Sequence, residues 1–166
     1  MKREGQQVFC AYQAEEIFAY IEEHPQYERV AVVLSGDVGF FSGAKEFLAC
    51  AKKREEEMEI RVIPGISSLV YFCAKLRVPW EKVKAVSVHG REEGLISSVR
   101  EHPAVFALAG GKNQIAKLCK KLTEYGFGEC EIAVGEKLSY PEERIWRGKV
   151  RECCELETES LSVFLI

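Results

Sequence analysis

Short runs of β-branched and apolar residues alternate with helix-period stripes over the first ninety residues, and this alternation limits the folds open to the chain. Residues 29–34, 58–63 and 83–90 are typical of strands. Apolar side chains recur at helical spacing from Ala14, ahead of the first of these strands, and again from Phe41, between the first two. Strands that alternate with helices predict right-handed crossovers and a mainly parallel sheet, which is an α/β fold.

The pattern changes after Gly90. A helix with the apolar stripe Ile115, Leu118, Cys119 and Leu122 is predicted within residues 112–128. A short strand pattern at residues 6–12 precedes the first helix, and after Gly90 further strand patterns occur at residues 104–111, 130–136, 144–153 and 161–166. The last two alternate enough to pair antiparallel. We therefore expect two α/β lobes, residues 1–90 and 91–166, with a mainly parallel first sheet and a mixed second sheet.

Composition excludes several classes of protein. The 166 residues carry a formal net charge of −3, whereas general nucleic-acid binding needs a basic surplus. No apolar run is long enough to cross a membrane, and the start, MKREGQQVF, is too polar for a signal peptide. Seven cysteines without a Cys-x-x-Cys pair predict reduced thiols, a cytoplasmic location and no metal site. Adjacent Cys153 and Cys154 are typical of alternate faces of a strand.

Four predicted strands end in a turn that combines glycine with a polar residue. These turns are Ser35-Gly36-Asp37, Pro64-Gly65-Ile66-Ser67-Ser68, Ala109-Gly110-Gly111-Lys112 and Gly135-Glu136. Ligands of open α/β sheets bind outside the carboxyl ends of the strands, where glycine lets the backbone approach them closely. Similar turns also occur in α/β proteins that bind nothing there. Their spacing fits neither G-x-G-x-x-G nor a P-loop, and no serine lies in a G-x-S-x-G elbow.

Four separated blocks carry a family resemblance. In order and spacing they resemble the tetrapyrrole methylase family, most closely its cobalt-precorrin carbon-5 methyltransferase branch. The blocks are LSGDVGFFSGAKEF, VIPGISSLVYFCAKLRVPWEKVKAVSVHGR, LAGGKN and VGEKLSYPEERI. The resemblance implies two α/β lobes, with S-adenosylmethionine held in the cleft between them and S-adenosylhomocysteine as product. It also implies a homodimer.

The resemblance further implies roles for individual residues. Cofactor contacts are expected from Gly36, Asp37, Val38, Gly39, Ser67, Ser68, Ala109 and Gly110. Substrate contacts are expected from Ser35, Phe40 and Arg91. A general base could be Asp37, His89 or a group linked to solvent, and the sequence does not choose between them. Because the substrate carries many carboxylates, Lys112 and Arg144 are further candidate anchors, although a solvated surface charge is an equal alternative for both.

Two departures from the family pattern stand out. Val38 occupies the place of the family's proline in Gly-Asp-Pro-Gly, so the loop loses a fixed backbone angle. The family also begins with a strand, a Gly-x-Gly-Pro-Gly loop and a helix that have no counterpart here, roughly forty residues at ordinary element lengths. On this comparison the first lobe is expected to be incomplete at its N-terminal side.

Three functions follow as hypotheses. The first is S-adenosylmethionine-dependent C-methylation of a cobalt-precorrin macrocycle in cobalamin biosynthesis. The second is an inactive, truncated methylase that persists as a folded dimer or as a partner subunit. The third is a methylase that acts at a different ring position. Positioning of the methyl group in a water-poor site would supply most of the rate acceleration in the first and third.

Overall fold

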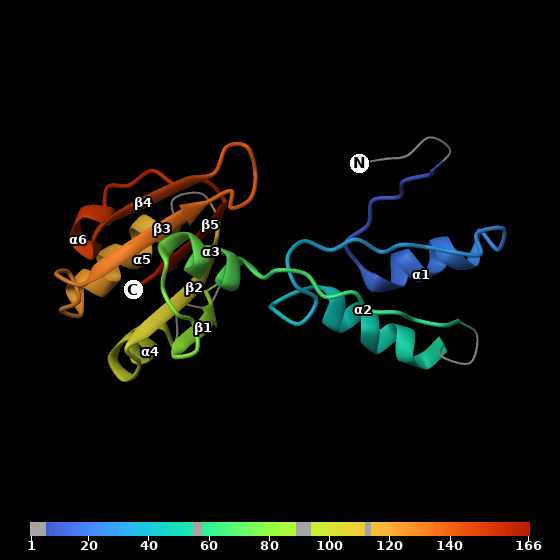
Figure 1. The fold of residues 1–166 in the computed structure, drawn as a ribbon, viewed down its shortest axis with the longest axis horizontal. Coiled ribbons are helices and arrows are strands. Elements are labelled where there is room, and N and C mark those ends of the chain that lie inside the picture. The colour runs from blue at the N-terminus through green and yellow to red at the C-terminus, as the bar shows by residue number, and fades with distance from the viewer. Residues whose placement is uncertain (1–5, 55–57, 89–93, 112–113) are drawn as a thin grey trace. The chain divides into compact units, whose positions relative to one another are not determined.

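The computed structural model describes residues 6–54, 58–88, 94–111 and 114–166 (Figure 1). The chain forms two compact units, residues 1–66 and 67–166. Residues 67–88 belong to the second unit because they form one strand of its sheet and one helix that packs against that sheet. The lobe boundary expected at residues 90 and 91 stays a prediction.

Two helices form the packed part of the first unit, as the apolar stripes predicted. They are α1 (Ala14–Glu22) and α2 (Ala44–Ala51), and a 3-10 turn, η1 (Lys52–Arg54), follows α2. Phe18 is fully buried and stacks on Phe47 with ring centroids 4.8 Å apart. The Arg54 guanidinium lies 4.6 Å from the centroid of the Phe18 ring. This small aromatic cluster joins the two helices.

The strands expected in the first unit do not form. Residues 6–12, 29–34 and 58–63 are largely extended, yet no described residue of this unit belongs to a strand, and Figure 1 draws no arrow there. Val33 is 88% exposed and Ile63 is 77% exposed. The prediction of a mainly parallel first sheet is therefore wrong for the described residues. Local propensity makes a segment extended, but a sheet also needs a neighbouring segment to accept its hydrogen bonds.

A mixed five-stranded sheet organises the second unit, as predicted for the second lobe, but it also includes the strand at residues 83–87, which was expected in the first sheet. Its order is β1-β2-β5-β3-β4. The strands are β1 (Val83–Ser87), β2 (Ala104–Gly110), β3 (Glu131–Glu136), β4 (Arg144–Lys149) and β5 (Leu161–Leu165). β1 and β2 are parallel, whereas β5 runs antiparallel to both β2 and β3. β5 therefore joins a parallel pair to the antiparallel hairpin of β3 and β4.

Four helices accompany this sheet. They are α3 (Ser68–Leu76), α4 (Leu95–Glu101), α5 (Gln114–Glu124) and α6 (Val150–Cys153). The last is a correction, because residues 150–153 were expected to continue a strand. The backbone N–H of Lys149 donates to Oε2 of Glu152 at 2.9 Å, which is a helix-start contact. Cys153 and Cys154 thus lie at the end of a short helix and not on opposite faces of a strand.

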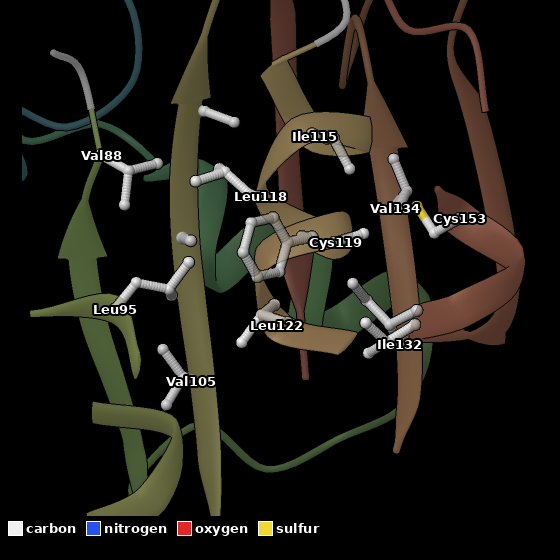
Figure 2. Packing of buried hydrophobic residues seen from close by; sticks show 14 residues of the cluster. Val88, Leu95, Val105, Ile115, Leu118, Cys119, Leu122, Ile132, Val134 and Cys153 are labelled. Carbon is white, nitrogen blue, oxygen red and sulfur yellow. The ribbon is translucent and has the colours of Figure 1, made fainter. Parts of the chain in front are cut away.

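The main core lies between α5 and one face of the sheet. All four residues of the predicted stripe, Ile115, Leu118, Cys119 and Leu122, are fully buried. Figure 2 shows them facing Val105 of β2 and Val134 of β3, with Cys153 of α6 beside them. Full burial of each large apolar side chain contributes about 1.5–3 kcal/mol, so this stripe anchors the unit.

The opposite face of the sheet packs against α3. Phe72 is fully buried and meets Phe106 of β2 edge-on, with ring centroids 6.4 Å apart. A Cβ atom placed on Gly135 would lie 2.7 Å from the Phe72 ring, so β3 approaches α3 too closely for any side chain there. These contacts fix α3, and with it the serines at its start, to the second unit.

We predict that Leu118→Ala lowers the free energy of unfolding of the second unit by about 2–5 kcal/mol, because it empties a fully packed site. Leu161→Ala is the matched control, since Leu161 is 59% exposed. Urea unfolding followed by circular dichroism measures both. Equal losses for the two variants would contradict the assigned core.

Hydrogen exchange separates the two kinds of extended segment. Backbone amides of residues 29–34 and 58–63 should exchange much faster than those of β2 and β5, because ladder hydrogen bonds protect only the latter. Mass spectrometry of peptic fragments reports both rates. Protection of residues 29–34 equal to that of β5 would show that they are paired in solution.

Candidate functional site

The Asp37 carboxylate links two of the glycine turns. Its Oδ1 accepts a hydrogen bond from the backbone N–H of Gly39 at 2.8 Å. Its Oδ2 accepts one from the backbone N–H of Gly65 at 3.2 Å. Each oxygen keeps a second lone pair, so the carboxylate can shape the loop and still accept from a ligand.

The same two turns approach each other at their glycines. A Cβ atom placed on Gly65 would lie 2.1 Å from the carbonyl oxygen of Gly36. Gly36 itself has a φ of +76°, which a residue with a side chain rarely adopts. The sequence marked Gly36 as a cofactor residue and placed Gly65 in a second candidate turn, but it did not show the contact of Gly65 with Asp37 across 28 residues.

The loop after Asp37 presents aromatic and apolar side chains. Val38 and Phe40 are half-buried, Ser35 is exposed, and Phe40 meets Phe41 edge-on at 5.0 Å between ring centroids. Phe41 is 58% exposed and has a φ of +47°. The structure therefore places Ser35, Gly36, Asp37, Val38, Gly39 and Phe40 on one continuous loop, as their sequence spacing required.

Ser67 and Ser68 begin helix α3. Ser67 is the N-cap, and its Oγ accepts from the backbone N–H of Val70 at 3.2 Å. Ser67 is 6% exposed, so its hydroxyl already serves the helix start. Ser67 therefore has a structural role as the cap of α3. A cofactor role for Ser67 and Ser68 stays a prediction.

Ala109 and Gly110 end strand β2, and two polar residues lie in line with them across the sheet. Ser162 of β5 is directly opposite Ala109 and, on its other side, directly opposite Glu136 of β3. Paired residues of antiparallel strands share one face, with Cβ atoms roughly 5 Å apart. The carboxyl end of β2 thus belongs to a row of small and polar side chains.

Glu136 is buried, being 5% exposed, and both its oxygens have partners. Oε2 accepts from Nε and Nη2 of Arg144 at 3.1 and 2.7 Å, and Oε1 accepts from the backbone N–H of Glu159 at 2.7 Å. Arg144, a candidate substrate anchor, is therefore bound to Glu136. A surface pocket of about 230 Å³ borders this pair and is lined by Glu136, Lys137, Glu142, Arg144 and Glu159.

A second carboxylate ties α3 to the loop between β3 and β4. Oε2 of Glu143 accepts from the Tyr71 hydroxyl at 2.6 Å and from the backbone N–H of Ser139 at 2.8 Å. Its Oε1 lies 2.9 Å from Nζ of Lys75. Hydrogen bonds from Lys75, from Tyr71 and from the Ser139 backbone lower the pKa of Glu143 to about 2. The Glu143 bond likewise raises the pKa of Lys75.

Some predicted site residues fall outside the described residues. They are His89, Arg91 and Lys112. Among the residues that are described, no group of three or more histidine, cysteine or acidic side chains could hold a metal ion. Across the same residues, no helix has the length and apolar character needed to cross a membrane.

Comparison with known proteins identifies relatives over most of the chain. The family model described as Tetrapyrrole (Corrin/Porphyrin) Methylases matches residues 2–154. A probable cobalt-precorrin-7 C(5)-methyltransferase of Methanocaldococcus jannaschii is 29% identical over 145 residues, which are 85% of this chain and 66% of the relative. The cobalt-precorrin-4 C(11)-methyltransferase of the same organism is 28% identical over 141 residues, which are 78% of this chain and 54% of the relative.

A solved structure shares the fold. The uroporphyrin-III C-methyltransferase of Thermus thermophilus, in complex with S-adenosylhomocysteine, superposes with a TM-score of 0.70 at 20% identity. The match covers 98% of this chain and 76% of that one. The chain spans about half to two thirds of the length of the two curated relatives.

We predict that Glu143→Gln lowers stability at neutral pH by about 1–3 kcal/mol, because a charge-assisted network is lost. The depressed pKa means that the Glu143 network stabilises the fold above the usual value of 4.5 and stops doing so as pH falls towards 2. The gap between wild type and variant should therefore shrink between pH 6 and pH 3 in thermal unfolding.

Glu142→Gln is the matched control for that experiment, since the neighbouring Glu142 side chain is exposed. It should change stability little at either pH. A gap between wild type and Glu143→Gln that is the same at pH 6 and pH 3 would mean that the ionised network does not contribute.

Proposed function

The chain belongs to the tetrapyrrole (corrin/porphyrin) methylase family, and we propose that it carries out S-adenosylmethionine-dependent C-methylation of a cobalt-precorrin macrocycle. The family model matches nearly the whole chain, and the two Methanocaldococcus relatives are named as cobalt-precorrin methyltransferases. Carbon 5 is the proposed position, since the relative at 29% identity bears that name. The relative at 28% identity is named for carbon 11, so analysis of the methylated product decides the ring position.

The observation that carries the proposal is the Asp37 link between two glycine turns. The Asp37 carboxylate accepts hydrogen bonds from the backbone N–H groups of Gly39 and Gly65 at 2.8 and 3.2 Å. The Gly36 carbonyl lies so close to Gly65 that a side chain at position 65 would not fit. Such a loop offers backbone groups and one carboxylate to a ligand without a bulky side chain in between. These features fit a polar, nucleoside-bearing cofactor, and Asp37 would accept from its hydroxyl or amino groups.

S-adenosylmethionine supplies an electrophilic methyl group when it is bound. The residues proposed to hold it are the Gly36–Gly39 turn, the Ser67-Ser68 helix start and the Ala109-Gly110 strand end. Their task is to orient the cofactor, since methyl transfer needs in-line geometry more than it needs charged catalysts. Phe40, together with Ser35 and Arg91, is proposed to meet the macrocycle, where an aromatic wall would exclude water.

The proton lost from the methylated carbon needs an acceptor. Asp37 is one candidate, because each of its oxygens retains a lone pair beyond its backbone hydrogen bond. His89 is the other candidate and lies outside the described residues. Comparison of pH–rate profiles for Asp37→Asn and His89→Gln separates the two.

A second candidate function is an inactive methylase that survives as a folded dimer or as a partner subunit. The unpaired extended segments of the first unit, residues 29–34 and 58–63, favour it, because exposed apolar segments can assemble with another surface. Cofactor binding without methyl transfer to any cobalt-precorrin would support this candidate. Turnover by the chain alone would exclude it. The proposed homodimer is checked by sedimentation equilibrium.

We predict that S-adenosylhomocysteine at millimolar concentration raises the Tm of the chain, since a ligand that binds only the folded state stabilises it. Asp37→Asn should weaken that binding about tenfold. The amide nitrogen of asparagine cannot accept a hydrogen bond, so one of the backbone bonds from Gly39 or Gly65, and the acceptor offered to the ligand on that side, would be lost. Isothermal titration calorimetry measures both dissociation constants.

Glu46→Gln on α2 serves as the matched control, because this acidic side chain is also in the first unit and is exposed. It should bind S-adenosylhomocysteine as the wild type does. Absence of both heat and a Tm shift for the wild-type chain would refute the proposed cofactor site.

A further inference from the structure

Ser162 carries a buried hydroxyl that lacks a hydrogen-bond partner. The residue is 3% exposed, and its Oγ contacts no donor or acceptor among the residues that the structure describes. The buried side chains of Ser67 and Glu136, by contrast, both have partners. A buried hydroxyl without a partner destabilises a fold, so its presence in a well-packed sheet calls for an explanation.

Ser162 lies next to the carboxyl end of β2, where the cofactor is proposed to bind. Ser162 lies between Ala109 of β2 and Glu136 of β3, in register with both. Phe164, two residues further along β5, belongs to the buried cluster beneath α5, so Ser162 faces the same side of the sheet. Both oxygens of Glu136 are already bound to Arg144 and to the Glu159 backbone. Ser162 is therefore the polar group of this row that still has its hydrogen-bonding capacity.

The neighbouring residues make a serine costly at this place. β5 reads Leu161-Ser162-Val163-Phe164-Leu165, and the three residues after Ser162 are buried and apolar. An alanine would fit the same space without an unpaired hydroxyl. Residues that lower the stability of the fold, such as a buried polar group without a hydrogen bond, are concentrated at functional sites.

We propose that Ser162 is a further cofactor-binding residue, whose hydroxyl forms a hydrogen bond with a polar group of the adenosyl cofactor beside Ala109. This inference rests on the proposed function, because it takes the carboxyl end of β2 to be part of the cofactor site. A hydroxyl donates one hydrogen bond and accepts two, so it can meet a donor or an acceptor of the ligand.

The test is Ser162→Ala in the full chain, with S-adenosylhomocysteine as the probe. Two readouts are taken: the Tm of the free protein and the dissociation constant from calorimetry. Removal of an unpaired hydroxyl should leave the Tm of the free protein unchanged or raise it by about 2–4 °C. The dissociation constant should rise about three- to tenfold, since one neutral hydrogen bond is lost.

Ser97→Ala is the control, because Ser97 is an exposed serine on α4 whose hydroxyl makes only a solvent-exposed bond to the Gly94 carbonyl, so the dissociation constant should stay unchanged and the Tm should change little. Wild-type affinity in Ser162→Ala would overturn the inference and leave the proposed function standing. A lower Tm for the free Ser162→Ala protein would overturn it too, since it would show that the hydroxyl bonds within the fold or to a fixed water. If the wild-type chain binds no S-adenosylhomocysteine, the inference and the proposed function both fall.

Discussion

The second unit depends on the pairing of β5 with two strands at once. β5 lies between β2 and β3, so it joins the parallel pair of β1 and β2 to the hairpin of β3 and β4. Without it, the sheet would be two separate pieces with open edges, and α5 would have no continuous surface to pack on. The same pairing brings Ala109 and Glu136, from distant parts of the chain, into one row with Ser162. The pairing of β5 with β2 and β3 therefore builds both the core and this part of the candidate site.

The first unit shows what happens when such a pairing is missing. Its helices α1 and α2 pack through Phe18, but residues 29–34 and 58–63 stay extended without ladder partners. In its turns, the Asp37 side chain accepts hydrogen bonds from the backbone of Gly39 and of Gly65, beside the backbone bond from the Phe40 N–H to the Asp37 carbonyl. A single carboxylate can fix a loop in this way because its two oxygens accept in different directions.

The sequence predicted those features that arise from local periodicity. The α5 stripe is fully buried as expected, since a 3.6-residue period specifies one helix face regardless of its partner. Residues 150–153 alternate like a strand yet form α6, because Glu152 caps the chain where β4 ends. The prediction of strands in the first unit was wrong because a strand needs a neighbouring segment to pair with, and local propensity does not specify that neighbour. Asp37 could be found from its glycine turn, whereas Gly65 and Ser162 are defined by contacts between distant segments.

The central proposal is that residues of the glycine turns and of the end of β2 bind an adenosyl cofactor. Titration of isotope-labelled chain with S-adenosylhomocysteine, followed by amide chemical shifts, tests it most directly. The account predicts that the largest shift changes fall on residues 36–39, on Gly65, and on the backbone around Ala109, Gly110 and Ser162. Changes confined to other parts of the chain, or none at millimolar ligand, would contradict it.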